Sequence, residues 1–233
     1  MSKPTYLLVH GAWGGAWCWE LFGTELDARG ARWRALDLPS SSPGAPPETY
    51  LIDDARDVAA QANELGPVIL VGHSYGGSVI TEAAPYVEDL RGLIYVAALL
   101  PQLGETSTDA SRVLKLRTPL DEAIRSDGVT LSLDTDLARG ALYQDCEDAL
   151  ANWALARLST QTFASFRSPR ASGDTGVFRR YVVCEDDRAI DPRTQRHLAR
   201  DCEDVVEMAS GHSPYLSRPS TLADLVLAPL PTN

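Results

Sequence analysis

A serine that lies between glycines has a hydroxyl group that can act as a nucleophile. Residues 72–77 read Gly-His-Ser-Tyr-Gly-Gly; the apolar run 67–71 precedes them and the helix-like stretch 78–87 follows. A strand that turns sharply through a serine into a helix holds the hydroxyl out above the edge of a sheet. A Cβ on Gly72 or Gly76 would crowd such a turn. The pattern therefore predicts Ser74 as a nucleophile.

A serine hydroxyl also needs a base, and a carboxylate must orient that base. Among the four histidines, His212 lies in a glycine-containing loop between the last apolar run and the final helical pattern. His73 lies inside the turn and is expected to point away from the nucleophile's face. His10 belongs to the first loop, and His197 lies within a helical pattern among arginines. We therefore predict His212 as the base.

The acid is expected in the loop after the preceding strand-like run, where four carboxylates compete. Glu185 adjoins the strand end and is too close to the sheet, and Asp191 precedes a proline, as a helix N-cap does. Asp187 is the preferred candidate and Asp186 the alternative. The resulting order of Ser74, Asp187 and His212 along the chain is the one expected when a serine turn of this kind carries a triad.

A second loop near the start of the chain can supply a stabilising group. Residues 10–19 read His-Gly-Ala-Trp-Gly-Gly-Ala-Trp-Cys-Trp and follow the apolar run 6–9. The tetrahedral intermediate of acyl transfer carries an oxyanion, which N–H groups stabilise by a few kcal/mol each. We predict that the backbone N–H groups of Ala12 and Tyr75 form this oxyanion hole. Trp17 and Trp19 are predicted to pack in the core.

Composition excludes several classes of protein. The 233 residues, 44% hydrophobic and 23% charged, suit one α/β domain with a modest insertion. The net charge of −11 disfavours a nucleic-acid partner. No apolar run reaches the roughly 18 residues of a membrane span, and the chain start enters a strand-like run at once, so we expect neither a membrane segment nor a signal peptide.

Cysteine and histidine spacing bears on the compartment and on metals. The four cysteines form no C-x-x-C pair, which favours free thiols and a cytoplasmic location. The histidines lack the spacing of metal ligands, so we expect no metal and no cofactor. The expected partner is a small-molecule ester, and a homodimer remains possible.

Apolar runs alternate with helical patterns along most of the chain. This alternation predicts an α/β fold with about six parallel strands and helices on both faces of the sheet. The segment 39–47 is a loop by composition, at the end of the sheet where ligands bind. The strand-like runs are 5–9, 32–38, 67–72, 92–100, 178–184 and 203–208, and the helical patterns are 17–29, 49–65, 75–88, 191–200 and 215–228.

The alternation stops between about residues 101 and 176. This stretch is charged, contains short helical patterns such as 146–158, and has no convincing buried strand. It is too long to be a loop within a compact core. We therefore expect residues 1–100 and 177–233 to form the core, and residues 101–176 to form a helical cap inserted after the fourth strand and covering the site.

Four segments carry a resemblance to a known family: 10–19, 72–77, 185–187 and 211–212. Through them the chain resembles the α/β-hydrolase superfamily. More narrowly, it resembles the branch of plant methyl esterases, hydroxynitrile lyases and bacterial small-ester hydrolases. The resemblance covers essentially the whole chain and is weakest over the cap. It implies the α/β-hydrolase fold, backbone donors at Ala12 and Tyr75, and a cap of short helices.

Two positions depart from the lyases of this branch. Those lyases have a threonine where Gly11 stands and a lysine where Ser213 follows the histidine, so this chain lacks an evident group to handle cyanide. A dehalogenase would need an aspartate in place of Ser74. We therefore expect a serine carboxylesterase acting on a small ester with a compact apolar or aromatic acyl group. The alternatives are a lactonase, a C–C hydrolase or a lyase on the same scaffold, or a ligand-binding protein with the hydrolase fold.

Overall fold

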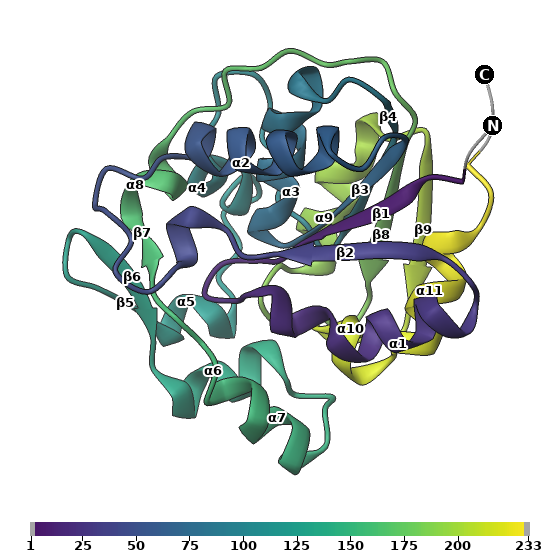
Figure 1. Ribbon diagram of the computed structural model, residues 1–233. Coiled ribbons are helices and arrows are strands. Elements are labelled where there is room, and N and C mark those ends of the chain that lie inside the picture. Colours follow the sequence, from purple (N-terminus) through teal and green to yellow (C-terminus); the bar gives the residue numbers. More distant parts are fainter. Residues whose placement is uncertain (1–2, 231–233) are drawn as a thin grey trace.

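The computed structural model describes residues 3–230 and is built around one parallel sheet (Figure 1). Its six strands lie in the order β2-β1-β3-β4-β8-β9, and every neighbouring pair is parallel. The prediction of a six-stranded parallel sheet is confirmed. The strands are β1 (Thr5–Val9), β2 (Arg32–Leu36), β3 (Val68–His73), β4 (Leu90–Val96), β8 (Arg179–Cys184) and β9 (Asp204–Met208).

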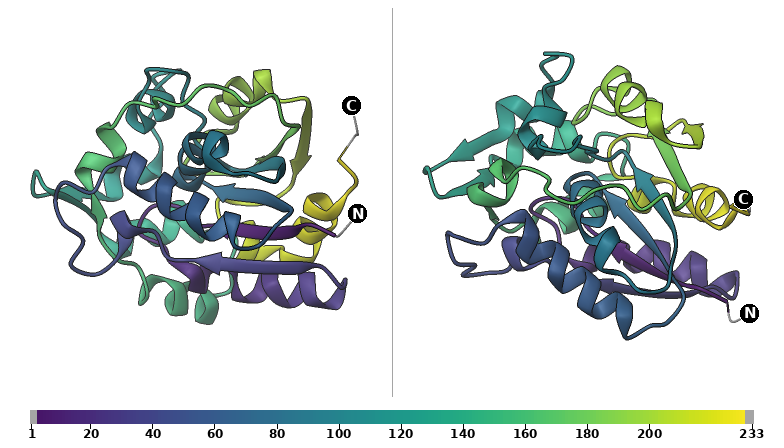
Figure 2. Two further views of the ribbon diagram at one scale, coloured as in Figure 1. Left: turned by 45° about the horizontal axis from the view of Figure 1, so that its top comes forward. Right: turned by 90° about the horizontal axis from the view of Figure 1, so that it is seen from above.

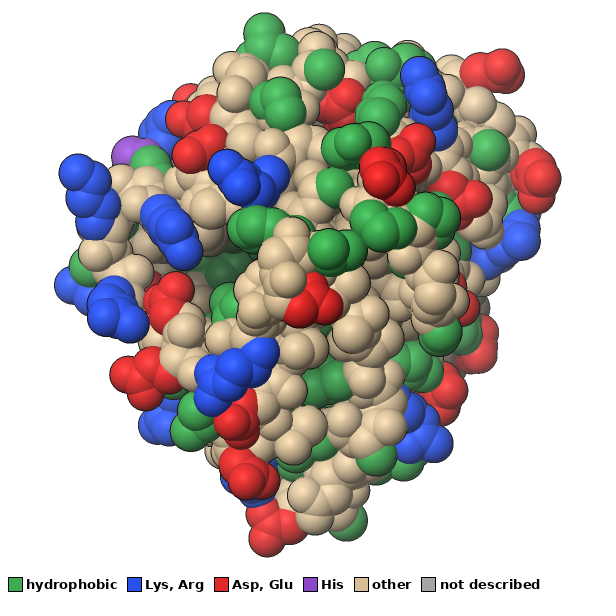
Figure 3. Space-filling model, turned by 90° about the vertical axis from the view of Figure 1, so that its left-hand side faces the viewer, with side chains coloured by type: hydrophobic (Ala, Val, Ile, Leu, Met, Phe, Trp, Pro, Cys, Tyr) green, Lys and Arg blue, Asp and Glu red, His purple; other side chains and the backbone are tan. Residues whose placement is uncertain are grey.

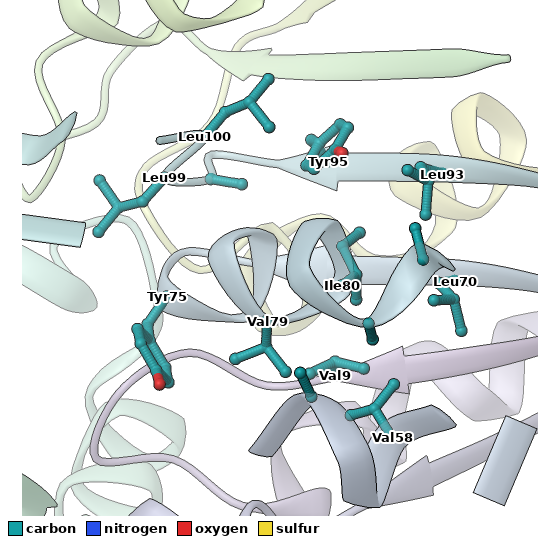
Figure 4. Close-up of a cluster of buried hydrophobic side chains, with 14 of the residues drawn as sticks. Val9, Val58, Leu70, Tyr75, Val79, Ile80, Leu93, Tyr95, Leu99 and Leu100 are labelled. Atoms are coloured by element: carbon teal, nitrogen blue, oxygen red, sulfur yellow. The ribbon is translucent and has the colours of Figure 1, made fainter. Parts of the chain in front are cut away.

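Helices cover both faces of the sheet, with α2, α3 and α9 on one face and α1, α10 and α11 on the other (Figures 1 and 2). Because successive side chains of a strand point to opposite faces, Val9 packs with the first group and Leu8 with the second. Figure 4 shows Val9 against Val58 of α2 and Val79 of α3. These helices are α1 (Glu20–Ala28), α2 (Leu51–Asn63), α3 (Tyr75–Ala83), α9 (Pro192–Leu198), α10 (Pro214–Ser217) and α11 (Pro219–Leu227).

The cap follows the fourth strand of the sheet, as expected, and lies beyond the carboxyl ends of the strands (Figure 1). It contains a three-stranded antiparallel sheet, β5-β6-β7, that the sequence analysis did not anticipate. These strands have three, four and two residues, too few for a clear alternating pattern. The cap elements are α4 (Ser107–Ser111), α5 (Pro119–Ala123), β5 (Ile124–Ser126), β6 (Thr130–Leu133), α6 (Thr135–Leu142), α7 (Asp148–Leu155), β7 (Gln161–Thr162) and α8 (Phe163–Arg167).

One expected strand ends earlier than predicted, and one expected helix is divided in two. Strand β4 stops at Val96 because Ala97 adopts a left-handed conformation, with a φ of 44°, which turns the chain out of the sheet. The final helical pattern divides into α10 and α11 at Pro219. A proline disfavours helical geometry in the residue before it, and Arg218 has a φ of −142°.

Candidate active site

The turn between β3 and α3 holds Ser74 in a strained conformation. Its φ of 52° and ψ of −121° lie outside the regions that a residue with a side chain normally adopts. A Cβ on Gly72 would lie 2.6 Å from the carbonyl oxygen of Gly76, and a Cβ on Gly76 would lie 2.5 Å from that of Val9. Both glycines are therefore required sterically, as predicted, because β1, β3 and α3 meet at this turn.

His212 and Asp187 meet in the adjacent loops. The Nδ1 of His212 lies 2.7 Å from Oδ2 of Asp187, and both side chains are buried. Oδ1 of Asp187 accepts hydrogen bonds from the backbone N–H groups of Ala189 at 2.6 Å and Ile190 at 2.9 Å. In the tautomer that carries its proton on Nδ1, the imidazole donates to this carboxylate, and Nε2 can accept a proton. Asp186, the alternative acid, is exposed.

Ser74 and His212 line the same small hollow, of about 330 Å³, together with Gly11 and Ala12. Tyr75 is the first residue of α3, so its N–H has no acceptor within the helix. The backbone N–H groups of Tyr75 and Ala12 make no hydrogen bond to another residue in the range 3–230. The structure thus brings every predicted site residue to one edge of the sheet, where the N–H groups of Ala12 and Tyr75 have no hydrogen-bond partner among residues 3–230.

Gln195 of α9 is a site residue that sequence reasoning missed. Its Nε2 donates to Oδ2 of Asp187 at 2.8 Å and to the carbonyl oxygen of Ile190 at 2.8 Å, while its Oε1 accepts the N–H of Cys184 at 3.0 Å. The amide therefore fixes the Asp187 carboxylate to the end of β8. The sequence signal for this residue was a glutamine in the expected helix, four residues after Asp191. Asp191 itself caps α9, as predicted.

His73 does not point away from the site as expected. Its Nε2–H donates to the carbonyl oxygen of His212 at 2.8 Å, and the two rings lie 4.6 Å apart. Burial, followed by the neighbouring His212, holds the pKa of His73 well below its ordinary value. His73 is therefore neutral near pH 7 and supports the loop of His212.

His10 shapes the loop that carries Ala12. Its Nδ1–H donates to the carbonyl oxygen of Gly11 at 2.7 Å, and its Nε2 accepts the N–H of Leu38 at 3.0 Å. Complete burial lowers the pKa of His10, which agrees with a neutral ring that donates on one side and accepts on the other.

Two neighbouring cap residues, Gln144 and Asp145, contact the backbone beside Asp187 and His212. Gln144 Nε2 donates to the carbonyl oxygen of Asp186 at 2.9 Å, and Asp145 Oδ2 accepts the N–H of Gly211 at 2.8 Å. Each contact lies one residue before a predicted catalytic residue. From the sequence, the cap was predicted only to cover the site, and no local pattern marked these two residues.

A family model described as the alpha/beta hydrolase family matches residues 6–225. The chain belongs to this family. It is 31% identical to the alpha/beta hydrolase nvfD of Aspergillus novofumigatus, over 97% of this chain and 96% of that relative. It is 30% identical to the carbendazim hydrolyzing esterase of a Nocardioides species, over 96% of this chain and 98% of that relative.

Solved structures agree with the observed fold. The crystal structure of a pyrethroid hydrolase from Sphingobium faniae superposes with a TM-score of 0.82 at 27% identity, over 97% of this chain and 96% of that chain. Polyneuridine aldehyde esterase superposes with a TM-score of 0.81 at 19% identity, over 97% of this chain and 98% of that chain, a likeness of fold alone. The expected α/β-hydrolase fold is confirmed, and the chain is related to esterases.

A larger cavity, of about 580 Å³, shares Trp13 and Ser74 with the small hollow. The cap holds Trp13 in place: its Nε1–H donates to the carbonyl oxygen of Leu131 at 3.0 Å, and its own carbonyl accepts the N–H of Ser159 at 2.8 Å. Most of the lining is apolar, with Leu99, Leu116, Leu120, Ile124, Phe166, Ala189 and Ile190. The cavity therefore suits a compact hydrocarbon or aromatic group.

Behind the turn, the Tyr75 side chain joins a buried polar cluster. Its hydroxyl donates to Oδ2 of Asp54 at 2.8 Å, and Ser40 donates to the same carboxylate through its N–H and its hydroxyl. Gln161 of β7 donates to the Ser40 hydroxyl at 2.7 Å, which links the cap to this cluster. Burial raises the pKa of Asp54 to about 6, against the opposing effect of these donors.

Within residues 3–230, no cluster of three or more histidine, cysteine or acidic side chains has the arrangement of a metal site. In the same range, no helix combines the length and the apolar character needed to cross a membrane.

Proposed function

We propose that the chain is a serine carboxylesterase. The observation that carries the proposal is that Ser74 and His212 line one hollow while Asp187 lies 2.7 Å from the far nitrogen of the imidazole. In this reaction, Nε2 of His212 removes the proton from the Ser74 hydroxyl as its oxygen attacks the ester carbonyl. Asp187 holds the imidazole in the required tautomer and stabilises the imidazolium that forms.

The oxyanion of the tetrahedral intermediate accepts hydrogen bonds from the N–H groups of Ala12 and Tyr75. The imidazolium then donates its proton to the leaving alcohol, which leaves an acyl group on Ser74. Water, deprotonated by His212, attacks this acyl-enzyme and regenerates the serine. The apolar lining of the larger cavity favours a small ester with an apolar or aromatic part, and relatives named as esterases support this class of reaction.

Two features argue against cyanohydrin chemistry. A Cβ on Gly11 would lie 2.8 Å from the Cβ of Ser74 and 2.9 Å from Nδ1 of His73, so this site has no room for a threonine there. The hydroxyl of Ser213 is buried and hydrogen-bonds with that of Tyr215 at 3.1 Å, so it offers no cation to a departing cyanide. Hydrolysis is therefore favoured over lyase activity.

The test measures release of p-nitrophenol from p-nitrophenyl butyrate in parallel with release of benzaldehyde from mandelonitrile at mildly acidic pH. We expect ester hydrolysis that falls on the order of 10³-fold or more in Ser74→Ala, and no benzaldehyde above background. Fluorophosphonate labelling should occur in the wild type and disappear in Ser74→Ala. Serine-dependent release of benzaldehyde without ester hydrolysis would overturn the proposal.

A further inference from the structure

The larger cavity beside Ser74 continues outward into a second hollow. The inner part, of about 580 Å³, and the outer part, of about 780 Å³, share Trp13, Ser111, Asp121, Ile124 and Phe166 in their linings. Figure 3, which views the cap side of the molecule, shows a hollow of this kind with hydrophobic side chains in its floor and lysine or arginine side chains near its edge. A substrate held at Ser74 can therefore extend outward past the apolar part.

The outer hollow is lined by two arginines, Arg112 and Arg167, which are both exposed. Within residues 3–230, neither guanidinium has a carboxylate partner within 4.0 Å. Arg167 lies only over the ring of Phe163, at 5.3 Å from its centroid. Lys115 and Arg117, in the same stretch of the cap as Arg112, likewise have no carboxylate partner in the described part of the chain.

These four unpaired cations lie in one part of the cap, in a chain that has 32 acidic and 21 basic residues. Some neighbouring arginines are paired, such as Arg125 with Asp134 at 2.8 Å and Arg193 with Asp191 at 2.7 Å, whereas Arg157 and Arg188 have no carboxylate partner in the described part of the chain but line neither part of this cavity. The one carboxylate in both linings, Asp121, is engaged in capping α5, where it accepts the Thr118 N–H at 2.8 Å. With two arginines and one carboxylate in its lining, the outer hollow carries a net positive charge of one.

We propose that the preferred substrate is an ester that carries a carboxylate at the end remote from the scissile bond. This inference rests on the proposed esterase function and specifies its substrate class. The apolar inner part accommodates the hydrocarbon between the two groups, and Arg112 and Arg167 attract the carboxylate in the outer part. Ester cleavage itself needs no change in the proposed steps, because the carboxylate stays outside the reacting centre.

The test compares kcat/KM for esters that differ only in the remote carboxylate. One pair varies the acyl part, with p-nitrophenyl hexanoate against mono-p-nitrophenyl adipate. The other varies the alcohol part, with hexyl acetate against 6-acetoxyhexanoate, followed by proton release. In at least one pair, we expect Arg112→Gln/Arg167→Gln to lower the ratio of anionic to neutral kcat/KM about tenfold, as loss of two partly screened charges predicts.

The matched control is Arg32→Gln/Arg56→Gln, which makes the same change in net charge at two exposed arginines that line none of these cavities. An unchanged ratio in the cavity variant, or an equal loss in the control, would overturn the inference while the esterase proposal stands.

If the wild type cleaves none of these esters, the esterase proposal fails for these substrates. A binding measurement then tests the anionic subsite independently of catalysis. Calorimetry with the Ser74→Ala protein would then compare monomethyl adipate with methyl hexanoate. Tighter binding of the anion that disappears in the Arg112→Gln/Arg167→Gln background supports the anionic subsite, and equal binding of the two ligands refutes it.

Discussion

A methyl group added at Gly211 tests whether the cap positions the triad. An alanine Cβ there would lie 2.4 Å from Gln144 Nε2 and 2.5 Å from Asp145 Oδ1, about 1 Å closer than ordinary van der Waals contact allows. Gly211 does not have a left-handed φ, so the backbone itself tolerates alanine. The two side chains must retreat, and their hydrogen bonds to Asp186 and Gly211 are then weakened or lost.

The size of the effect follows from these contacts. Loss of two hydrogen bonds of about 1 kcal/mol each should lower the free energy of unfolding by about 2 kcal/mol. Without these two hydrogen bonds the loop of His212 is held less firmly, and a displacement approaching 1 Å should lower kcat on the order of 100-fold, because the imidazole leaves its productive geometry. KM should change much less, since none of Gly211, Gln144 and Asp145 lines the apolar cavity.

The assay is steady-state hydrolysis of p-nitrophenyl butyrate, with urea unfolding as the measure of stability. Gly140→Ala is the matched control: this glycine lies in α6 of the cap, and a Cβ there would meet no atom within 4 Å. The control should keep wild-type kcat and gain a little stability from the better helix propensity of alanine. Wild-type kcat in Gly211→Ala would refute the positioning role of the Gln144 and Asp145 contacts.

Two further substitutions test individual carboxylates. Asp187→Asn should lower kcat/KM by about 10³- to 10⁴-fold, because an amide favours the wrong imidazole tautomer. Asp186 is exposed, so Asp186→Asn should keep kcat/KM within a few-fold of wild type. A larger loss in Asp186→Asn than in Asp187→Asn would identify Asp186 as the acid. The pKa of Asp54 is about 6 in the folded state against an ordinary 3.8, so the folded protein binds this proton more tightly than the unfolded chain does. The contribution of Asp54 to the free energy of unfolding therefore rises as the pH falls through 6. Relative to Asp54→Asn, the wild type should gain about 1 kcal/mol of unfolding free energy between pH 7 and pH 5 in urea titrations; parallel pH profiles would show that Asp54 does not titrate in this range.

The amino-acid sequence by itself determined the frame of this protein. Alternating apolar runs and helical patterns specify a parallel sheet with two helical layers, because each strand must bury both of its faces. The glycines at 72 and 76 identify the serine turn, because their requirement arises from backbone contacts close by. The order of Ser74, Asp187 and His212 follows from the strands that precede each residue. Pro219 divides the last helix by a local effect, but the predicted helical pattern 215–228 did not take it into account.

Tertiary structure alone decided how the loops meet. Asp186 and Asp187 are neighbours in one acidic turn, and only the path of the chain after β8 places the second against His212 and leaves the first in solvent. Gln144 and Asp145 reach backbone groups 42 and 66 residues further along the chain. Such contacts depend on the packing of the cap against loops from different strands. Local periodicity carries no information about this packing, so the role of the cap beside the triad became visible only in the folded chain.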